Sequence, residues 1–163
     1  TSLTVPEFQG EKLRTRDMLQ VRMKRISTGD TLDFIVCHHP SKYGGSEVSQ
    51  ARRMAAMTSL AGLCDSLGST PKVVMGDFND ELWTSEDEKR GSRGTIKYNG
   101  RWEKIDGYFA YGDIVVQEYI FEDKILLTED KTYGGYKPQR CFTGPVYLGG
   151  ISDHLPLVLM ISF

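Results

Sequence analysis

Residues 73–79 of the chain read Val-Val-Met-Gly-Asp-Phe-Asn, an apolar run that ends in short polar side chains. A short apolar run rich in β-branched residues is typical of a buried strand. Asp77 and Asn79 lie two positions apart, so both can face one cleft where this strand ends. A Gly-Asp turn followed by an Asn-Asp loop would have the same composition, and Asp80 fits that alternative. The stretch therefore predicts a buried strand that ends in either a turn or a pair of catalytic side chains.

Three further stretches place polar side chains beside a predicted strand. They are His38 after the apolar strand 31–37, Asp106 within the predicted strand 105–111, and Asp153-His154 ahead of the apolar run 155–163. Each has a plainer explanation as a turn, a cap or a structural histidine. Four such sites in one chain are less probable by chance than any one alone, so we expect them to share one cleft.

The residue types in this expected cleft suit the hydrolysis of a phosphate ester with a hard divalent metal ion. His154 could carry a proton, and Asp106 could orient its second ring nitrogen as in a catalytic triad. His38 could donate to a phosphate oxygen, whereas we expect the adjacent His39 to be merely exposed at the end of its strand. The order and spacing of these residues, rather than any one of them, favour the catalytic interpretation.

The composition is that of an ordinary soluble globular protein of 163 residues, a length that suits one domain with a real core. The net charge of −2 excludes the globally basic surface of a dedicated nucleic-acid binder and argues mildly against a nuclease. A basic edge at Lys42, Arg52 and Arg53 is more often a solvated helix face. Cys37 and Cys64 lie in apolar patterns, which predicts reduced core thiols.

No stretch approaches the roughly 20 apolar residues of a membrane span. The chain starts with Thr1 and shows no basic segment leading into an apolar one, so no signal peptide is visible. We expect a soluble protein of undetermined localisation, with any targeting signal in a missing N-terminal region. Residues 1–15 are expected to be an irregular N-terminal segment, followed by one domain portion over 16–163.

The periodicity predicts a layered, mixed α/β domain. Alternation at Leu19, Val21 and Met23, together with residues 31–37, predicts a hairpin. A helix is expected over 47–67, between an N-cap at Ser46 and a stop at Gly68. The helix stripe that should face a sheet comprises Met54, Met57, Leu60, Cys64 and Leu67. Further strands are expected at 73–75, 105–111, 115–121 and 155–163, the last a central strand covered on both faces, with a long loop at 83–100 and an irregular region at 129–147.

Four motifs, taken in order, resemble those of the endonuclease/exonuclease/phosphatase superfamily, the family of DNase I. They are Val-Cys-His-His-Pro-Ser at 36–41, Gly-Asp-Phe-Asn-Asp at 76–80, Lys-Ile-Asp-Gly-Tyr-Phe at 104–109 and Ser-Asp-His-Leu-Pro at 152–156. The resemblance covers residues 16–163 and implies the C-terminal half of a DNase I-like four-layer α/β sandwich. Such a half is an α/β (α+β) domain with a mixed or antiparallel sheet and helices on one face. The family hydrolyses phosphate esters with Mg²⁺ or Mn²⁺ by in-line attack of water.

The resemblance also implies a role for each matching residue. Asp77 would orient or deprotonate the attacking water, and Asn79 would stabilise the pentacoordinate transition state and contact the substrate phosphate. His154 would be the catalytic histidine, with Asp106 as its carboxylate partner. His38 would bind the substrate phosphate.

Asp153 and Asp77 would bind the metal ion, but the principal glutamate ligand of the family is absent from this chain. Glu7 and Glu11 lie in the expected irregular segment and not after a core strand. We therefore expect Mg²⁺ or Mn²⁺ to be weakly bound or absent, and the chain to be inactive alone. Half a sandwich would also expose one sheet face, which predicts either a homodimer through that face or a missing N-terminal half of the domain as partner.

Two functions stay open at this point. The chain is either the C-terminal half of an active phosphoesterase or a non-catalytic, self-associating module that keeps an affinity for phosphate. Its substrate would be a phosphodiester or phosphomonoester, with nucleic acid, phospholipid, sugar and inositol phosphate all open. Tyr98 and Trp102 could stack on a base or a sugar, although packing of the loop explains them as well.

Overall fold

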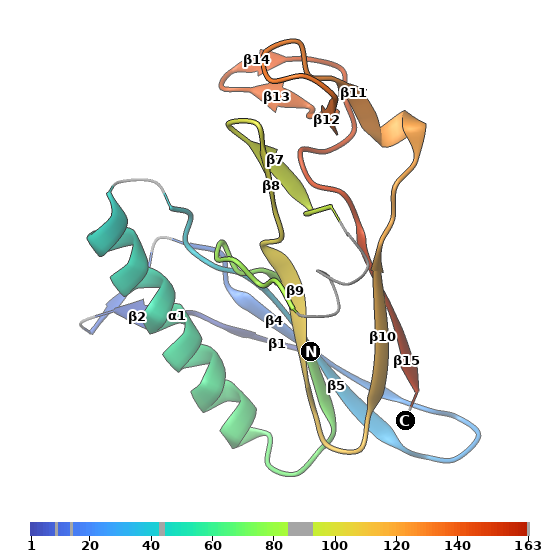
Figure 1. Ribbon diagram of the computed structural model, residues 1–163. Helices are drawn as coiled ribbons and strands as arrows, with labels where there is room; N and C mark the ends of the chain where they lie inside the picture. The colour runs from blue at the N-terminus through green and yellow to red at the C-terminus, as the bar shows by residue number, and fades with distance from the viewer. Residues whose placement is uncertain (9, 14, 43–44, 85–92, 163) are drawn as a thin grey trace. The chain divides into compact units, whose positions relative to one another are not determined.

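The computed structural model describes residues 1–8, 10–13, 15–42, 45–84 and 93–162. It forms two compact units (Figure 1). Unit 1 comprises Thr1–Asp80, Asp106–Val116 and Ile161–Phe163, and unit 2 comprises Glu81–Ile105 and Gln117–Met160. The chain passes between the units more than once. The domain bounds expected from the sequence, 1–15 and 16–163, stay a prediction.

A five-stranded mixed sheet forms the centre of unit 1, in the order β1-β4-β5-β6-β9. The bounds of its strands are β1 Ser2–Thr4, β4 Met18–Lys24, β5 Thr31–His38, β6 Lys72–Asp77 and β9 Asp106–Tyr111. β5 and β6 are parallel, and the other neighbouring pairs are antiparallel. Helix α1, Ser46–Ser66, connects the two parallel strands, as a parallel pair requires (Figure 1). This arrangement confirms the predicted mixed α/β fold class.

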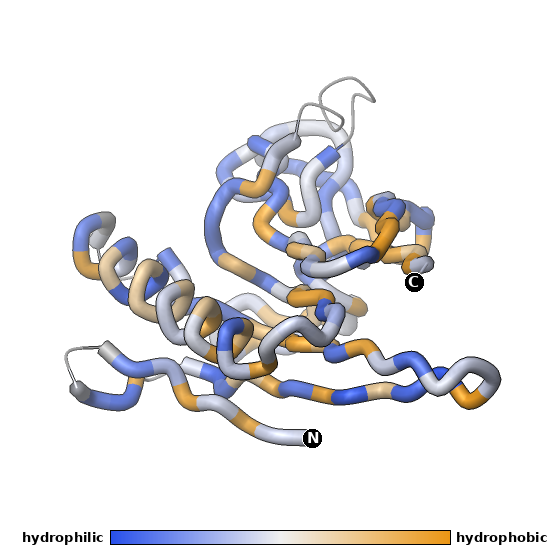
Figure 2. Tube along the Cα trace, turned by 90° about the horizontal axis from the view of Figure 1, so that it is seen from below, coloured by the Kyte–Doolittle hydropathy of each residue, from blue (hydrophilic) through white to orange (hydrophobic). Residues whose placement is uncertain are grey.

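The face of α1 that is buried differs from the predicted stripe. Ala56, Leu60 and Cys64 are buried, but Met54 is 64% exposed and Met57 is 40% exposed. Arg53 takes the buried position one residue before Met54. In Figure 2, hydrophobic and hydrophilic segments alternate along the coil of α1, so the pattern alone leaves the buried face ambiguous.

The two ends of α1 lie close to their predicted positions. Gly45, and not Ser46, is the N-cap residue, and no side chain caps the helix there. At the other end the C-cap is Leu67, and Gly68 follows with a φ of +61°. Gly68 stops the helix because a glycine adopts the left-handed conformation without a steric penalty.

Residues 1–15 are not irregular, as the sequence suggested, but contain short strands. β1 extends the central sheet beside β4, and its Ser2 hydroxyl donates a hydrogen bond of 2.8 Å to Gln20 Oε1. β2, Glu7–Phe8, and β3, Glu11–Lys12, pair as a small antiparallel ladder. Strands of two or three residues are too short for alternation to reveal them.

Unit 2 is built from small hairpins. Their bounds are β7 Ile96–Tyr98, β8 Arg101–Glu103, β11 Leu127–Glu129, β12 Tyr136–Pro138, β13 Phe142–Thr143 and β14 Val146–Tyr147, with the short 3₁₀ helix η1 at Lys124–Leu126. The loops predicted at 83–100 and 129–147 thus contain strands, while residues 85–92 lie outside the described part. The turn between β7 and β8 is Asn99-Gly100, both at positive φ, which is a strong hairpin signal.

β10, Val115–Ile120, and β15, Leu157–Ser162, pair as a two-stranded sheet. The expectation that residues 155–163 form a central strand covered on both faces is therefore wrong, and Met160 is 52% exposed. A run that is apolar at every position predicts burial on both faces only when further strands flank it.

A buried carboxylate holds the turn after β11. Asp130 Oδ2 lies 2.9 Å from Lys97 Nζ, and its Oδ1 accepts the backbone N–H groups of Thr132 and Tyr133. The hydrogen bond from Lys97 and these N–H groups lower the pKa of Asp130 to about 2. The charged carboxylate thus joins β7 to the 130–135 turn.

The cysteines match their expected state. Cys37 and Cys64 are buried free thiols, and burial raises the pKa of Cys37 to about 12. Among the residues that the structure describes, no helix has both the length and the apolarity needed to cross a membrane.

Candidate active site

Three of the predicted site residues lie in one row across the sheet of unit 1. In the register of the strands, His38 at the end of β5 pairs with Asp77 at the end of β6, and Asp77 pairs with Asp106 at the start of β9. Residues paired in this way point to the same face of a sheet and lie about 5 Å apart. The topology therefore gathers three polar side chains from distant parts of the sequence at one edge.

Asp77 is the central residue of this row. Its Oδ2 lies 3.5 Å from Nε2 of His38, and its Oδ1 accepts a hydrogen bond of 2.8 Å from the backbone N–H of Asn79. A carboxylate oxygen of Asp77 and one of Asp106 lie within 4.8 Å of each other. The side chain of Asp77 is 13% exposed, so this carboxylate is fixed but open to a ligand.

Asn79 adopts a backbone conformation that few residues other than glycine share. Its φ is +52°, and its Nδ2 donates a hydrogen bond of 2.9 Å to the carbonyl oxygen of His39. Asparagine tolerates the left-handed region better than other side chains do. The loop after β6 is thus both a turn, as the composition allowed, and a rigid support for two polar side chains.

His39 is buried, and the expectation that it is exposed is wrong. It is 2% exposed, its ring packs edge-on against Phe78 with centroids 5.1 Å apart, and its N–H donates to the carbonyl oxygen of Asp77. The strand pairing continues one residue past His38, so alternation turns the next side chain to the other face. Burial, with the nearby charges of His38 and Arg53, lowers the pKa of His39 to about 4, which leaves it neutral at pH 7.

Arg53 connects helix α1 to the same loop. It is buried, not part of a solvated helix face as expected, and its Nε lies 3.6 Å from Oδ2 of Asp80. A buried guanidinium needs such a carboxylate to offset the loss of water. The loop carrying Asp77 and Asn79 is therefore held from β5 by His39 and from α1 by Arg53.

Gly76 allows β5 and β6 to approach closely beside the site. A Cβ at this position would lie 1.8 Å from the carbonyl oxygen of Cys37, which no side chain can accommodate without moving the backbone. The glycine of the Gly-Asp-Phe-Asn motif is thus required by packing between the strands.

A family model covers nearly the whole chain, matching residues 2–91 and 88–162, and it describes the endonuclease/exonuclease/phosphatase family. The chain belongs to the endonuclease/exonuclease/phosphatase family. No curated protein sequence matches it.

Solved structures share the fold of this family member. The mannosyl-6-phosphatase of Bacteroides thetaiotaomicron VPI-5482 superposes with a TM-score of 0.58 at 17% identity, over 90% of this chain and 57% of that one. The human nocturnin catalytic domain with bound sulfate gives 0.54 at 16% identity, over 99% of this chain and 58% of that one. Staphylococcus aureus beta toxin with bound magnesium ions also has a TM-score of 0.54 at 16% identity, over 87% of this chain and 56% of that one. The chain thus spans little more than half the length of these solved structures.

Two predicted site residues of this family motif lie in unit 2. Asp153 is exposed, and His154 is half-buried with its backbone N–H donating to Ser152 Oγ. The next residue, Leu155, is buried, and its N–H donates to the carbonyl oxygen of Thr95, which anchors the motif within unit 2. The expected pairing of His154 with Asp106 joins residues of different units and stays a prediction, as does the role of Asp153.

The donor set of unit 1 fits the hard metal ion that the family resemblance implies. Asp77 and Asp106 offer carboxylate oxygens within 4.8 Å of each other, and Mg²⁺ and Mn²⁺ prefer such oxygen ligands. Of this pair only Asp77 was predicted as a metal ligand, whereas Asp106 was predicted as the partner of His154. The metal-binding role of Asp77 stays a prediction.

Proposed function

We propose that this chain carries one side of the active site of a metal-dependent phosphoesterase, which hydrolyses a phosphomonoester or phosphodiester by in-line attack of water. The row of His38, Asp77 and Asp106 across three neighbouring strands carries the proposal. Family membership and the shared fold of phosphatase structures support it.

Each residue of the row has a role that its position allows. Asp77, held by the N–H of Asn79, orients the attacking water and accepts its proton as the new P–O bond forms. His38 donates to a non-bridging oxygen of the scissile phosphate. Asn79 offers an uncharged amide to the pentacoordinate transition state, where developing charge gains most from fixed dipoles.

The leaving oxygen needs a proton as its bond to phosphorus breaks, and we assign this donation to His154 with Asp106 orienting the ring. This assignment rests on the family motif at 152–156. Asp77 and Asp153 would hold Mg²⁺ or Mn²⁺, which supplies Lewis-acid stabilisation of charge on the phosphate when bound.

Full activity, in this proposal, requires the part of the domain that the solved structures have and this chain does not match. That part would supply the principal glutamate ligand of the metal ion. The 163 residues alone are then expected to be inactive, or nearly so.

One observation favours the second function, a self-associating module. Leu3, Leu19 and Val36 are direct partners across β1, β4 and β5, so they share one face of the sheet. Leu3 is 64% exposed and Val36 is 42% exposed. An apolar face of this kind could be covered by the rest of the domain or by a second copy of the chain.

The test is hydrolysis of p-nitrophenyl phosphate and bis-p-nitrophenyl phosphate with Mg²⁺ or Mn²⁺, by this chain and by the full-length protein. We expect activity in the full-length protein that a chelator removes, and a fall of about 10²–10⁴-fold in Asp77→Asn and His154→Ala. Asp113→Asn, an exposed carboxylate at the turn after β9, is the matched control and should keep its activity. Near-normal turnover in both site variants would refute the site, and a chain that dimerises without activity in either form would favour the module.

A further inference from the structure

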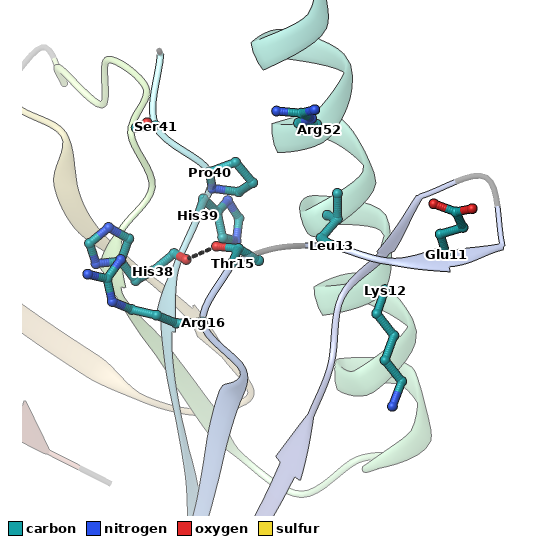
Figure 3. Close-up of a pocket in the computed structure, with 10 residues that line it drawn as sticks. All are labelled: Glu11, Lys12, Leu13, Thr15, Arg16, His38, His39, Pro40, Ser41 and Arg52. Carbon is teal, nitrogen blue, oxygen red and sulfur yellow. Dashed lines mark hydrogen bonds between the residues drawn. The ribbon is translucent and has the colours of Figure 1, made fainter. Parts of the chain in front are cut away.

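A pocket of about 390 Å³ opens beside His38 in unit 1. His38 belongs to its lining, but Asp77 and Asp106 do not. Figure 3 shows its walls: the segment around Arg16 and Thr15, the segment from His38 to Ser41 after β5, and Arg52 on helix α1. The pocket therefore extends from the proposed phosphate-binding histidine toward α1.

The charges of this pocket differ from those of the whole chain. Arg16 and Arg52 contribute two cationic groups, against one carboxylate from Glu11, while Lys12 lines the pocket with its charged end pointing away from His38 and His39 (Figure 3). The chain as a whole has a net charge of −2. A concave site lined mainly by one sign of charge concentrates ligands of the opposite sign.

The inner wall of the pocket carries an unpaired polar atom. His39 is 2% exposed, and its Nε2 has no hydrogen-bond partner among the described residues. Buried polar atoms are nearly always paired, so an unpaired one beside a cavity indicates a place for a ligand or water. The Thr15 hydroxyl donates a hydrogen bond of 3.1 Å to the carbonyl oxygen of His38, which ties the two walls together.

We propose that this pocket is a subsite for a second phosphate group of the substrate. The scissile phosphate lies at His38, and the second phosphate of the same small molecule is bound by Arg16 and Arg52. A guanidinium binds phosphate through two parallel hydrogen bonds, a geometry that lysine cannot offer. The volume suits a compact bisphosphorylated molecule better than a polymer, because pockets of roughly 300–1,000 Å³ enclose small ligands. The inference rests on the proposed function for the identity of the His38 site.

The test compares the binding of glucose 1,6-bisphosphate and glucose 6-phosphate to this chain by isothermal titration calorimetry. We expect the bisphosphate to bind about 10-fold or more tightly, and Arg16→Ala and Arg52→Ala each to remove most of this difference. Arg16→Lys should restore little of this difference in affinity, because lysine keeps the positive charge but lacks the planar guanidinium group that forms two parallel hydrogen bonds. Lys24→Ala is the matched control, because Lys24 is an exposed cation at the other end of the β4–β5 hairpin.

Equal affinity for the two sugars, or an equal loss in Lys24→Ala, would overturn the subsite and indicate unspecific attraction of anions. Nuclear magnetic resonance gives an independent readout, in which only the bisphosphate should shift the amide signals of Thr15 and Ser41. Because binding is measured without hydrolysis, the two proposals fail separately. A bisphosphate preference without turnover in the full-length protein would refute the phosphoesterase alone, whereas turnover without the preference would refute the subsite alone.

Discussion

The side-chain amide of Asn79 donates a hydrogen bond of 2.9 Å to the backbone carbonyl oxygen of His39. The two residues are 40 positions apart in the chain and follow the parallel strands β6 and β5. Because the acceptor is a backbone atom, the position of the Asn79 side chain is set by strand pairing and not only by its own rotamer. The same residue has a φ of +52°, so its backbone also depends on being asparagine.

Replacing Asn79 should therefore affect both activity and stability. If the proposed phosphoesterase function is correct, Asn79→Ala is expected to lower its rate by about 10²–10³-fold. It should also destabilise the fold by about 2 kcal/mol, because it loses a hydrogen bond and puts a Cβ without a compensating polar group in the left-handed region. Steady-state kinetics and urea unfolding measure the two effects.

Asn79→Gly separates these effects, since glycine adopts positive φ without a steric penalty. It should lose as much activity as the alanine variant but less stability. Equal losses of stability in the two variants would show that the backbone conformation does not matter, and a fully active glycine variant would remove Asn79 from the catalytic machinery.

The buried His39 predicts a defined dependence of stability on pH. In the unfolded chain the imidazole takes up a proton below about pH 6.5, whereas in the folded chain it stays neutral until about pH 4. The unfolded state binds more protons in this window, so the free energy of unfolding falls as the pH falls from 6.5 to 4. The full shift corresponds to about 3 kcal/mol.

His39→Phe keeps an aromatic ring against Phe78 but cannot take up a proton. Urea unfolding at pH 7, 5.5 and 4.5 should show a smaller loss of stability for this variant than for the wild-type chain. The two proteins share all their other titrating groups, so the difference between their pH profiles of stability reports on His39 alone. Identical pH profiles would mean that His39 is accessible to protons in the folded state.

The sequence predicted that polar side chains from separate strands gather at one edge of the sheet in unit 1, because strand ends can be recognised from the local pattern. That these residues are catalytic stays a prediction. Val73 and Val74 mark a buried strand, β6, which ends at Asp77. Its parallel neighbour β5 ends at His38 and its antiparallel neighbour β9 begins at Asp106, so pairing brings the three residues together. The period of two in strands is strict, so the face of each residue follows from its position. The match to the endonuclease/exonuclease/phosphatase family covers nearly the whole chain.

Other features could not be predicted, each for a physical reason. The burial of His39 depends on pairing that continues past the apolar run, and nothing local reveals where pairing stops. On α1 the charged residue Arg53 takes a buried position near Asp80, and this contact exists only in the folded chain. The β7–β8 hairpin was detectable, because its Asn99-Gly100 turn is a strong local signal that the polar composition of residues 83–100 concealed.

Gly76 offers a test of how closely the site depends on the approach of β5 and β6. Gly76→Ala would place a methyl group 1.8 Å from the carbonyl oxygen of Cys37, so the strands must separate. We expect a loss of about 3 kcal/mol in the free energy of unfolding and a displacement of Asp77 from His38. Urea unfolding measures the loss of stability, and the rate of the proposed phosphoesterase reaction measures the displacement of Asp77.

Gly62 in helix α1 is the matched control for this substitution. A Cβ there would meet nothing within 4 Å, so Gly62→Ala should stabilise the helix by about 0.5–1 kcal/mol. If Gly76→Ala proved as stable as the wild-type chain, the close approach of the two strands would not be required for folding.

The carboxylate of Asp130 should make the stability of unit 2 sensitive to acid. Its pKa is about 2 in the folded chain, chiefly through Lys97, against about 3.9 when unfolded. The stabilisation is therefore complete above pH 3.9 and is lost as the pH falls from there toward 2. Asp130→Asn should lower the stability at pH 7, where Lys97 loses its charged partner, and should make the stability depend less on pH below pH 4.

Guanidinium unfolding at pH 7, 4 and 2.5 measures this dependence, with Glu129→Gln, an exposed neighbour, as the control. If the Asp130→Asn variant still lost stability steeply in acid, other carboxylates would be responsible for the acid sensitivity.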